Sequence, residues 1–182
     1  MSRLSAWILK CLGWRVTGWD PMSLRKYVLI VIPHTSNWDF PLGVLIRSSL
    51  GWDIKFVAKD TLFRWPFGGL LRWMGGYPVD RTKSNNYVEA VAEIFEENPD
   101  FRLTIAPEGT RSKVEKLKSG FYYIAQKAQV PIILVAFDYG KKLVKIADPI
   151  SPNISYEDLY VLMRKFYQDV TGKNPQLGYE FK

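Results

Sequence analysis

The chain has few of the residues that usually build disulfides and metal sites. Its 182 residues include one cysteine, Cys11, and one histidine, His34. A single cysteine excludes an intrachain disulfide and a cysteine-based zinc site, and it fits a reducing compartment. No apolar run approaches the ~18 residues that a membrane-spanning helix needs, and residues 4–14 are too short and too interrupted for a secretory signal. We therefore expect that the chain does not cross a bilayer by itself.

Acidic residues are also in the minority, because 18 Asp and Glu stand against 25 Lys and Arg, for a net charge of +7. This charge fits an anionic partner such as nucleic acid, anionic lipid, a phosphorylated substrate or an acidic carrier protein. The basic residues are scattered and no nucleic-acid-binding motif accompanies them, so we expect no nucleic acid. Aromatic residues make up 15% of the chain. Trp and Tyr suit the boundary between water and hydrocarbon, which favours a lipid surface.

Apolar runs typical of strands alternate with amphipathic segments typical of helices. Strands are expected at residues 14–19, 27–32, 54–58, 77–79, 101–106, 131–139 and 143–147, and helices at 37–50, 85–97, 121–129 and 155–170. This alternation predicts a single α/β domain over residues 1–182, with a largely parallel or mixed central sheet flanked by helices. The tail from Gly172 has no regular pattern.

The N-terminal residues 1–15 are expected to include a short amphipathic helix. One stripe of this helix is apolar and consists of Leu4, Trp7, Ile8, Cys11 and Leu12. The stripe has two interpretations. It packs against the core of the domain, or it is an anchor that lies in a membrane interface.

The only histidine lies where a buried strand, 27–32, gives way to a helix. Ser36 or Asn37 is predicted to cap that helix, which places Asp39 in its first turn. The Asp39 carboxylate can then turn back and hold one imidazole nitrogen of His34, leaving the other nitrogen free to take a proton. The alternative is a structural histidine near a strand end.

Two further loops follow predicted strands and carry polar or flexible residues. Residues 75–81 run from a glycine pair to Arg81, and residues 107–112 contain Thr110 and Arg111. The paired N–H groups of an arginine guanidinium match the spacing of two phosphate oxygens. Each loop could also be an ordinary polar turn.

Taken in order, these loops resemble the glycerophosphate and lysophosphatidate acyltransferase family over roughly residues 27–138. His34-Thr35-Ser36-Asn37-Trp38-Asp39 matches the family's His-x4-Asp block, and Glu108-Gly109-Thr110-Arg111-Ser112 matches its Glu-Gly-Thr-Arg-Ser block closely. Residues 75–81 and 130–133 resemble its second and fourth blocks more loosely. The chain departs from the family at Ala106, where phenylalanine is common, and at Leu134, where a second proline is usual.

The resemblance implies a glycerolipid acyltransferase-like fold with its motifs in residues 27–138. It also implies transfer of a fatty acyl group from acyl-CoA or acyl-carrier protein to the hydroxyl of a lysophosphatidate-like glycerolipid, in phospholipid biosynthesis. His34 is then the catalytic base and Asp39 its orienting partner, with no metal or further cofactor required. The expected substrate-binding residues are Arg81, Glu108, Gly109, Thr110 and Arg111. Of these, Arg81 and Arg111 would hold the acceptor phosphate, Glu108 would position an arginine or a polar group of the acceptor, and N–H groups around Gly109 would hold the oxyanion.

Such substrates are poorly soluble, so we expect a peripheral protein on the cytoplasmic, inner face of an anionic cell membrane. Two alternatives stay open at this point. The acceptor could be another lysophospholipid or an amino-acid lipid, or the chain could be a lipid-binding module without turnover. Intact His34 and Asp39 favour an enzyme over the second alternative.

Overall fold

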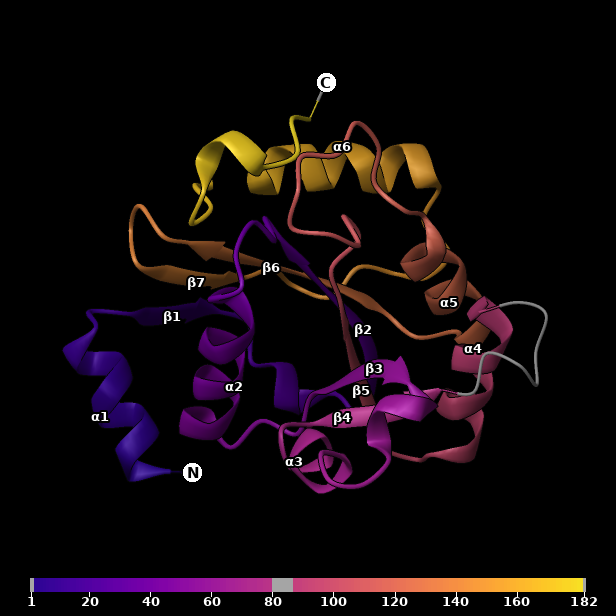
Figure 1. The fold of residues 1–182 in the computed structure, drawn as a ribbon. Helices are drawn as coiled ribbons and strands as arrows, with labels where there is room; N and C mark the ends of the chain where they lie inside the picture. Colours follow the sequence, from indigo (N-terminus) through magenta and orange to yellow (C-terminus); the bar gives the residue numbers. More distant parts are fainter. Residues whose placement is uncertain (1, 80–86, 182) are drawn as a thin grey trace.

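The computed structural model describes residues 2–79 and 87–181. The strands of these residues form one seven-stranded sheet in the order β1-β7-β6-β2-β5-β3-β4 (Figure 1). They are β1 (Arg15–Gly18), β2 (Lys26–Ile32), β3 (Lys55–Lys59), β4 (Gly76–Val79), β5 (Phe101–Ile105), β6 (Ile132–Asp138) and β7 (Leu143–Ile146). The β6–β7 pair is antiparallel and the other neighbouring pairs are parallel. The prediction of an α/β fold with a mixed sheet is therefore confirmed.

Helices cover both faces of this sheet. They are α1 (Arg3–Cys11), α2 (Asp39–Leu50), α3 (Gly68–Trp73), α4 (Tyr87–Glu97), α5 (Gly120–Ala128) and α6 (Tyr156–Tyr167), with 3-10 turns η1 (Pro21–Ser23), η2 (Asp60–Phe63) and η3 (Pro175–Leu177). Each helix of the described residues is too short or too polar to cross a membrane.

The alternation of side chains along β2 explains the two layers of helices. Val28, Ile30 and Ile32 join one buried cluster with residues of α4, α5 and α6, whereas Tyr27 and Leu29 join a second cluster with residues of α1 and α2. Successive strand residues point to opposite faces, so a strand that is covered on both faces must be apolar throughout. This requirement accounts for the uninterrupted apolar run of β2.

The site depends on the direction of the central strands. β6, β2 and β5 are neighbours and run parallel, so their carboxyl ends meet at one edge of the sheet. The chain that leaves these ends contains Tyr139 after β6, His34 after β2 and Glu108 after β5. Side chains more than 100 positions apart in the sequence are thereby brought together.

Candidate active site

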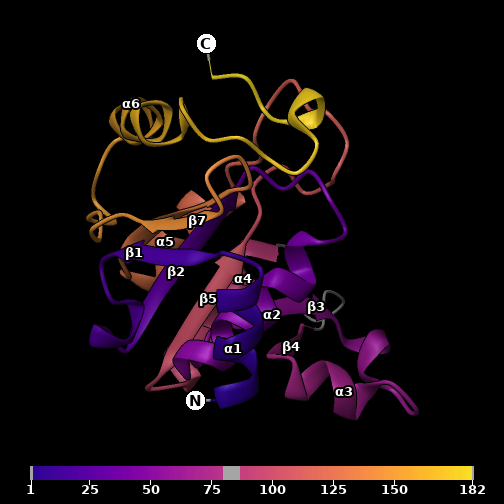
Figure 2. The same cartoon turned by 90° about the vertical axis from the view of Figure 1, so that its left-hand side faces the viewer.

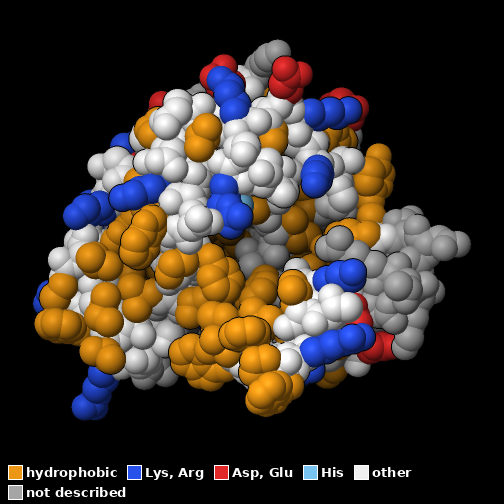
Figure 3. Space-filling view, viewed as in Figure 1, with side chains coloured by type: hydrophobic (Ala, Val, Ile, Leu, Met, Phe, Trp, Pro, Cys, Tyr) orange, Lys and Arg blue, Asp and Glu red, His pale blue; other side chains and the backbone are white. Residues whose placement is uncertain are grey.

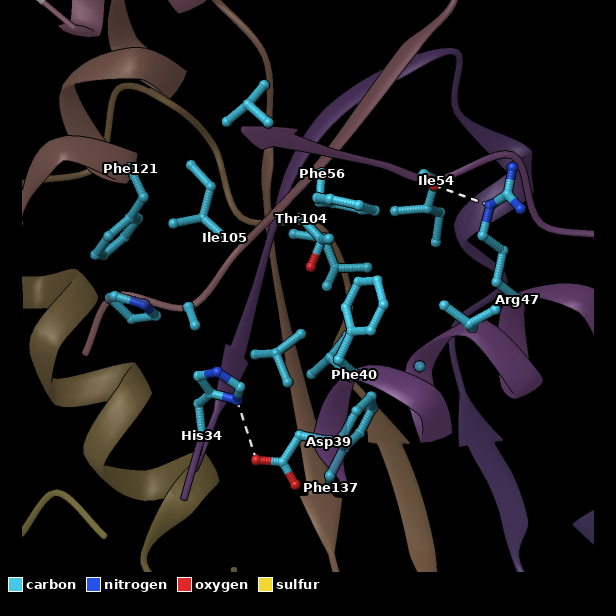
Figure 4. Close-up of a pocket in the computed structure, with 18 of the residues that line it drawn as sticks. His34, Asp39, Phe40, Arg47, Ile54, Phe56, Thr104, Ile105, Phe121 and Phe137 are labelled. Carbon is cyan, nitrogen blue, oxygen red and sulfur yellow. Dashed lines mark hydrogen bonds and ion pairs between the residues drawn. The ribbon is translucent and has the colours of Figure 1, made fainter. Parts of the chain in front are cut away.

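The Asp39 carboxylate lies against His34 and is the centre of a compact hydrogen-bond network. Its Oδ2 accepts from Nδ1 of His34 at 3.0 Å and from the backbone N–H groups of Thr35 and Ser36, both at 2.9 Å. Its Oδ1 accepts from the hydroxyl of Tyr139 at 2.7 Å. Asp39 is only 4% exposed, and its contact with Nδ1 leaves Nε2 as the nitrogen available for a reaction (Figure 4).

The expected helix cap is wrong. The helix begins at Asp39, and the N-cap position belongs to Trp38, which makes no side-chain capping bond. The Asp39 carboxylate accepts hydrogen bonds from the backbone N–H groups of Thr35 and Ser36, which precede the helix. Ser36 accepts instead from the backbone N–H of Trp38, at 3.2 Å. Within the first turn of the helix, the N–H of Asp39 donates to the carbonyl of Ser36 at 3.3 Å, and Pro41 has no N–H group that needs a partner.

The network also keeps Asp39 ionised. Burial raises the pKa of Asp39, but the hydrogen bonds from His34, Tyr139 and Ser36 together outweigh this cost, and the net pKa is lowered. An anionic carboxylate on Nδ1 fixes the tautomer of the ring and stabilises an imidazolium that forms on proton uptake. His34 is therefore oriented to accept a proton at Nε2.

Glu108 lies behind His34 with a buried side chain. Its Oε2 accepts the backbone N–H of His34 at 2.7 Å, and the backbone of Tyr179 also acts to lower the pKa of the carboxyl group. Burial is the main reason that the pKa of Glu108 rises from 4.5 to about 7. We expected this residue to hold an arginine or the acceptor, whereas the structure places it on the backbone that carries the histidine.

This shifted pKa predicts a particular pH dependence of stability. The folded state keeps the Glu108 proton over a pH range in which the unfolded chain has lost it, so the unfolding free energy falls as pH rises from about 4.5 to about 7. Glu108→Gln keeps an acceptor for the His34 N–H but cannot ionise. Between pH 4.5 and pH 8, its stability relative to the wild type is expected to rise by up to about 3 kcal/mol.

Urea denaturation across this pH range measures the effect. Glu96→Gln, on the exposed side of α4, is the matched control and should follow the wild type throughout. Parallel pH curves for the wild type and Glu108→Gln would contradict the prediction.

The remainder of the Glu-Gly-Thr-Arg-Ser segment is an exposed turn. Gly109 has φ +66°, a left-handed conformation that favours glycine, and its N–H donates to the carbonyl of Ala106 at 3.0 Å. That N–H is thus engaged within the turn, and the expectation that N–H groups around Gly109 hold the oxyanion stays a prediction for the other N–H groups of this loop. Thr110 and Arg111 are exposed beside the turn, and the Thr110 hydroxyl accepts from the N–H of Ser112 at 3.3 Å.

Two basic residues bear on the binding of a phosphate group, one of them expected from the sequence and the other not. Arg81, the other expected phosphate ligand, lies outside the described residues, beyond the end of β4. Lys118 was not anticipated, and it crosses Gly109 so closely that a Cβ on the glycine would lie 2.6 Å from its Nζ. Lys118 therefore presents its cation beside the loop that holds Glu108.

An apolar cavity of about 690 Å³ opens beside His34 and extends between the sheet and α2. Figure 4 shows His34 towards one end of this space and Arg47 at the other, with Phe40, Phe56 and Phe137 between them. Gly109 and Lys118 also line it. At the far end the Arg47 guanidinium is held by the carbonyl of Ile54, with Nε 3.0 Å from the oxygen. The cavity is of the size and polarity of a ligand pocket.

Comparisons with known proteins agree with this arrangement. A model of the Acyltransferase family matches residues 14–138. The 1-acyl-sn-glycerol-3-phosphate acyltransferase of Saccharomyces cerevisiae is 25% identical over 91% of this chain and 61% of its own length. The human 1-acyl-sn-glycerol-3-phosphate acyltransferase beta is 31% identical over 46% of this chain and 32% of its own. The chain thus spans less than two thirds of the length of these relatives.

The fold is also found in a solved structure. The crystal structure of the 1-acyl-sn-glycerophosphate (LPA) acyltransferase PlsC of Thermotoga maritima superposes with a TM-score of 0.57, at 20% identity, over 91% of this chain and 72% of that one. This likeness concerns the fold. Since the family model spans most of the chain, including both the His34–Asp39 and the Glu108–Ser112 segments, the protein belongs to the Acyltransferase family.

Proposed function

We propose that the protein transfers a fatty acyl group from an acyl thioester, either acyl-CoA or acyl-carrier protein, to the free hydroxyl of a lysophosphatidate-like glycerolipid. The observation that carries this proposal is the 3.0 Å contact between Nδ1 of His34 and Asp39 at an opening of the apolar cavity. Nε2 is then placed to act as a general base next to a space that fits an acyl chain.

The reaction needs only one base and one leaving group. The acceptor hydroxyl gives its proton to Nε2 of His34 while its oxygen attacks the thioester carbonyl. The tetrahedral intermediate then collapses, breaks the carbon–sulfur bond and releases the thiolate, which recovers the proton from the imidazolium. Asp39 stabilises the imidazolium between the two steps. The acceptor hydroxyl occupies the place of a nucleophilic serine, so no acyl-enzyme is required.

The polar end of the acceptor needs cations near His34. We propose that Arg111 and Arg81 hold its phosphate, as the family motifs imply, and that Lys118 adds a charge at the cavity wall. Arg111→Lys keeps the charge but loses the two-pronged guanidinium, so KM for a phosphorylated acceptor should rise by about tenfold with little change in kcat.

Initial rates with a phosphorylated acceptor and its dephosphorylated counterpart test this assignment. Arg15→Lys, at an exposed arginine of the edge strand β1, is the matched control. If Arg111→Lys discriminates between the two acceptors as well as the wild type does, Arg111 has another role. Lys118→Gln, measured in the same way, tests the second cation.

We also propose that the enzyme works on the cytoplasmic, inner face of an anionic cell membrane. Exposed apolar side chains gather over α1, α2 and α3 on the face that Figure 3 shows, which also carries a hollow. The exposed members from α1, α2, η2 and α3 and from the residues directly beside these elements are Leu4, Trp7, Leu12, Trp38, Phe40, Leu62, Trp65, Phe67, Leu70 and Trp73, here called the apolar face. A patch of this kind favours contact with lipid.

An acyl-transfer assay decides between the proposed activity and its alternatives. Lysophosphatidate, other lysophospholipids and an amino-acid lipid are offered as acceptors, each with acyl-CoA and with acyl-carrier protein as donor. Transfer that is fastest to lysophosphatidate supports the proposal, and preference for another acceptor favours the nearest alternative. Lipid binding without transfer to any acceptor, unchanged by His34→Ala, would identify a lipid-binding module.

A further inference from the structure

Residues beyond position 138, where the match to the family ends, form one side of the candidate active site. The first of them, Tyr139, donates its hydroxyl to Oδ1 of Asp39 at 2.7 Å. Tyr139 is itself fixed from three sides. Its backbone N–H donates to the carbonyl of Thr171 at 2.8 Å, Trp14 packs edge-on with ring centroids 5.0 Å apart, and Nζ of Lys173 lies 5.7 Å from the ring centroid.

The C-terminal segment 171–179 then crosses the turn that carries His34. The backbone N–H of Asn174 donates to the Thr35 hydroxyl at 3.1 Å, and its side-chain amide donates to the Thr35 carbonyl at 2.8 Å. Gly172 is packed so tightly that a Cβ there would lie 2.7 Å from the Thr35 hydroxyl oxygen. The backbone of Tyr179 acts to lower the pKa of Glu108. Figures 1 and 2 both show this segment passing beside the turn after β2.

These contacts converge on the His34–Asp39 pair from outside the family motifs. We propose that Tyr139 and the segment 171–179 are positioning elements of the active site, with Tyr139 acting through Asp39 to set how readily His34 takes a proton. The kinetic consequence of this inference rests on the proposed function, but the protonation of His34 does not.

The physical reason is the sharing of negative charge. Four donors divide the charge of the Asp39 carboxylate, one of them the Tyr139 hydroxyl. When that hydroxyl is removed, the charge concentrates on the bond to His34 and stabilises the imidazolium more strongly. Within the described residues, charged groups near the pair include Glu108, behind the His34 backbone, Lys118 at the cavity wall and Lys173 over the Tyr139 ring. Tyr139→Phe leaves all three in place.

The chain offers a direct measurement because His34 is its only histidine. In the protein without an affinity tag, NMR signals of the imidazole report the titration of this residue without any assay of turnover. Tyr139→Phe is expected to raise the midpoint, whereas Asp39→Asn should lower it. Tyr122→Phe is the matched control, because its buried hydroxyl donates to the carbonyl of Ile154 at 2.9 Å, far from Asp39 in the fold. A midpoint in Tyr139→Phe that is unchanged or lowered would overturn the role of Tyr139.

A second variant tests the segment 171–179. Asn174 is partly exposed, and its replacement with alanine removes the side-chain amide that donates to the Thr35 carbonyl. The N–H groups of Thr35 and Ser36, which donate to Asp39, should then exchange with solvent about tenfold faster. Unchanged exchange would overturn the positioning role of the segment.

The failure of this inference and that of the proposed function are distinguishable. If the midpoint moves as expected but no acceptor is acylated, the positioning role stands and the proposed function fails. If acyl transfer is observed and the midpoint does not move, Tyr139 has no such role. When both hold, the acid limb of kcat/KM for Tyr139→Phe should move in the same direction as the NMR midpoint.

Discussion

Replacing His34 with alanine is expected to lower kcat for acyl transfer by about 10²- to 10⁴-fold, the loss typical of a missing general base. The reason is specific to this chain: within the described residues, His34 is the group that combines an oriented imidazole, held by Asp39 at 3.0 Å, with a place on the cavity wall. KM for the acyl donor should change little, because the apolar lining that would hold the chain is untouched.

The control for this experiment is to show that the His34→Ala protein still folds. His34 contributes its backbone N–H to Glu108, and alanine preserves that bond, so the circular dichroism spectrum and the urea midpoint should stay close to those of the wild type. Turnover near the wild-type rate in a folded His34→Ala protein would exclude His34 as the base. Restoration of activity by added imidazole would support the assignment, because a small base can then enter the vacated space.

The part of this site that could be predicted from the sequence is the part that is local. An apolar strand, a short turn and a helix fix where a residue falls relative to a neighbour five positions later, so the His34–Asp39 contact followed from residues 27–50 alone. The meeting of the loops after β2 and β5 follows from the parallel sheet that the alternation of strands and helices predicts, because parallel strands end on the same side.

The parts that were missed depend on contacts between distant residues. Nothing near Tyr139 in the sequence indicates Asp39, which lies 100 positions earlier. The one available signal was the position of Tyr139 directly after an apolar strand. Lys118 and Asn174 stand in polar stretches where the pattern does not separate a site residue from a solvated one. The contact of Glu108 with the backbone N–H of His34, 74 positions earlier, was missed for a related reason, because burial directs a carboxyl group to a partner that is distant in the sequence.

The apolar face could be predicted only in part. The stripe of α1 was visible in the sequence, but whether it packed inward was open. In the structure α1 docks on α2 through Leu9 and through a contact between the Ser5 and Ser48 hydroxyls at 3.0 Å, and this arrangement leaves Trp7 63% exposed. The segment from Leu62 to Trp73 folds into η2 and α3 with Trp65 93% exposed. Both elements therefore present tryptophan to the surroundings.

This geometry predicts that Trp65→Glu and Trp7→Glu each release the protein from anionic vesicles, with a loss of partitioning of about 10²-fold for each. Burying one large apolar side chain contributes about 1.5–3 kcal/mol, and a carboxylate placed near anionic lipid adds repulsion. Flotation with vesicles of defined composition measures the loss. Leu162→Glu is the matched control: Leu162 is an exposed leucine on α6, away from the apolar face, so the same change of charge there should reduce binding far less.

Salt and lipid charge separate the two contributions to binding. The net charge of +7 should make the wild type bind anionic vesicles more tightly than neutral ones, with the difference shrinking as salt screens the interaction. Activity of Trp65→Glu on detergent-dispersed substrate should stay close to that of the wild type, because the tryptophan does not line the cavity. Equal partitioning onto neutral and anionic vesicles at low salt would refute the electrostatic part. Binding of Trp65→Glu and Trp7→Glu as tight as that of Leu162→Glu would show that the apolar face does not meet the membrane.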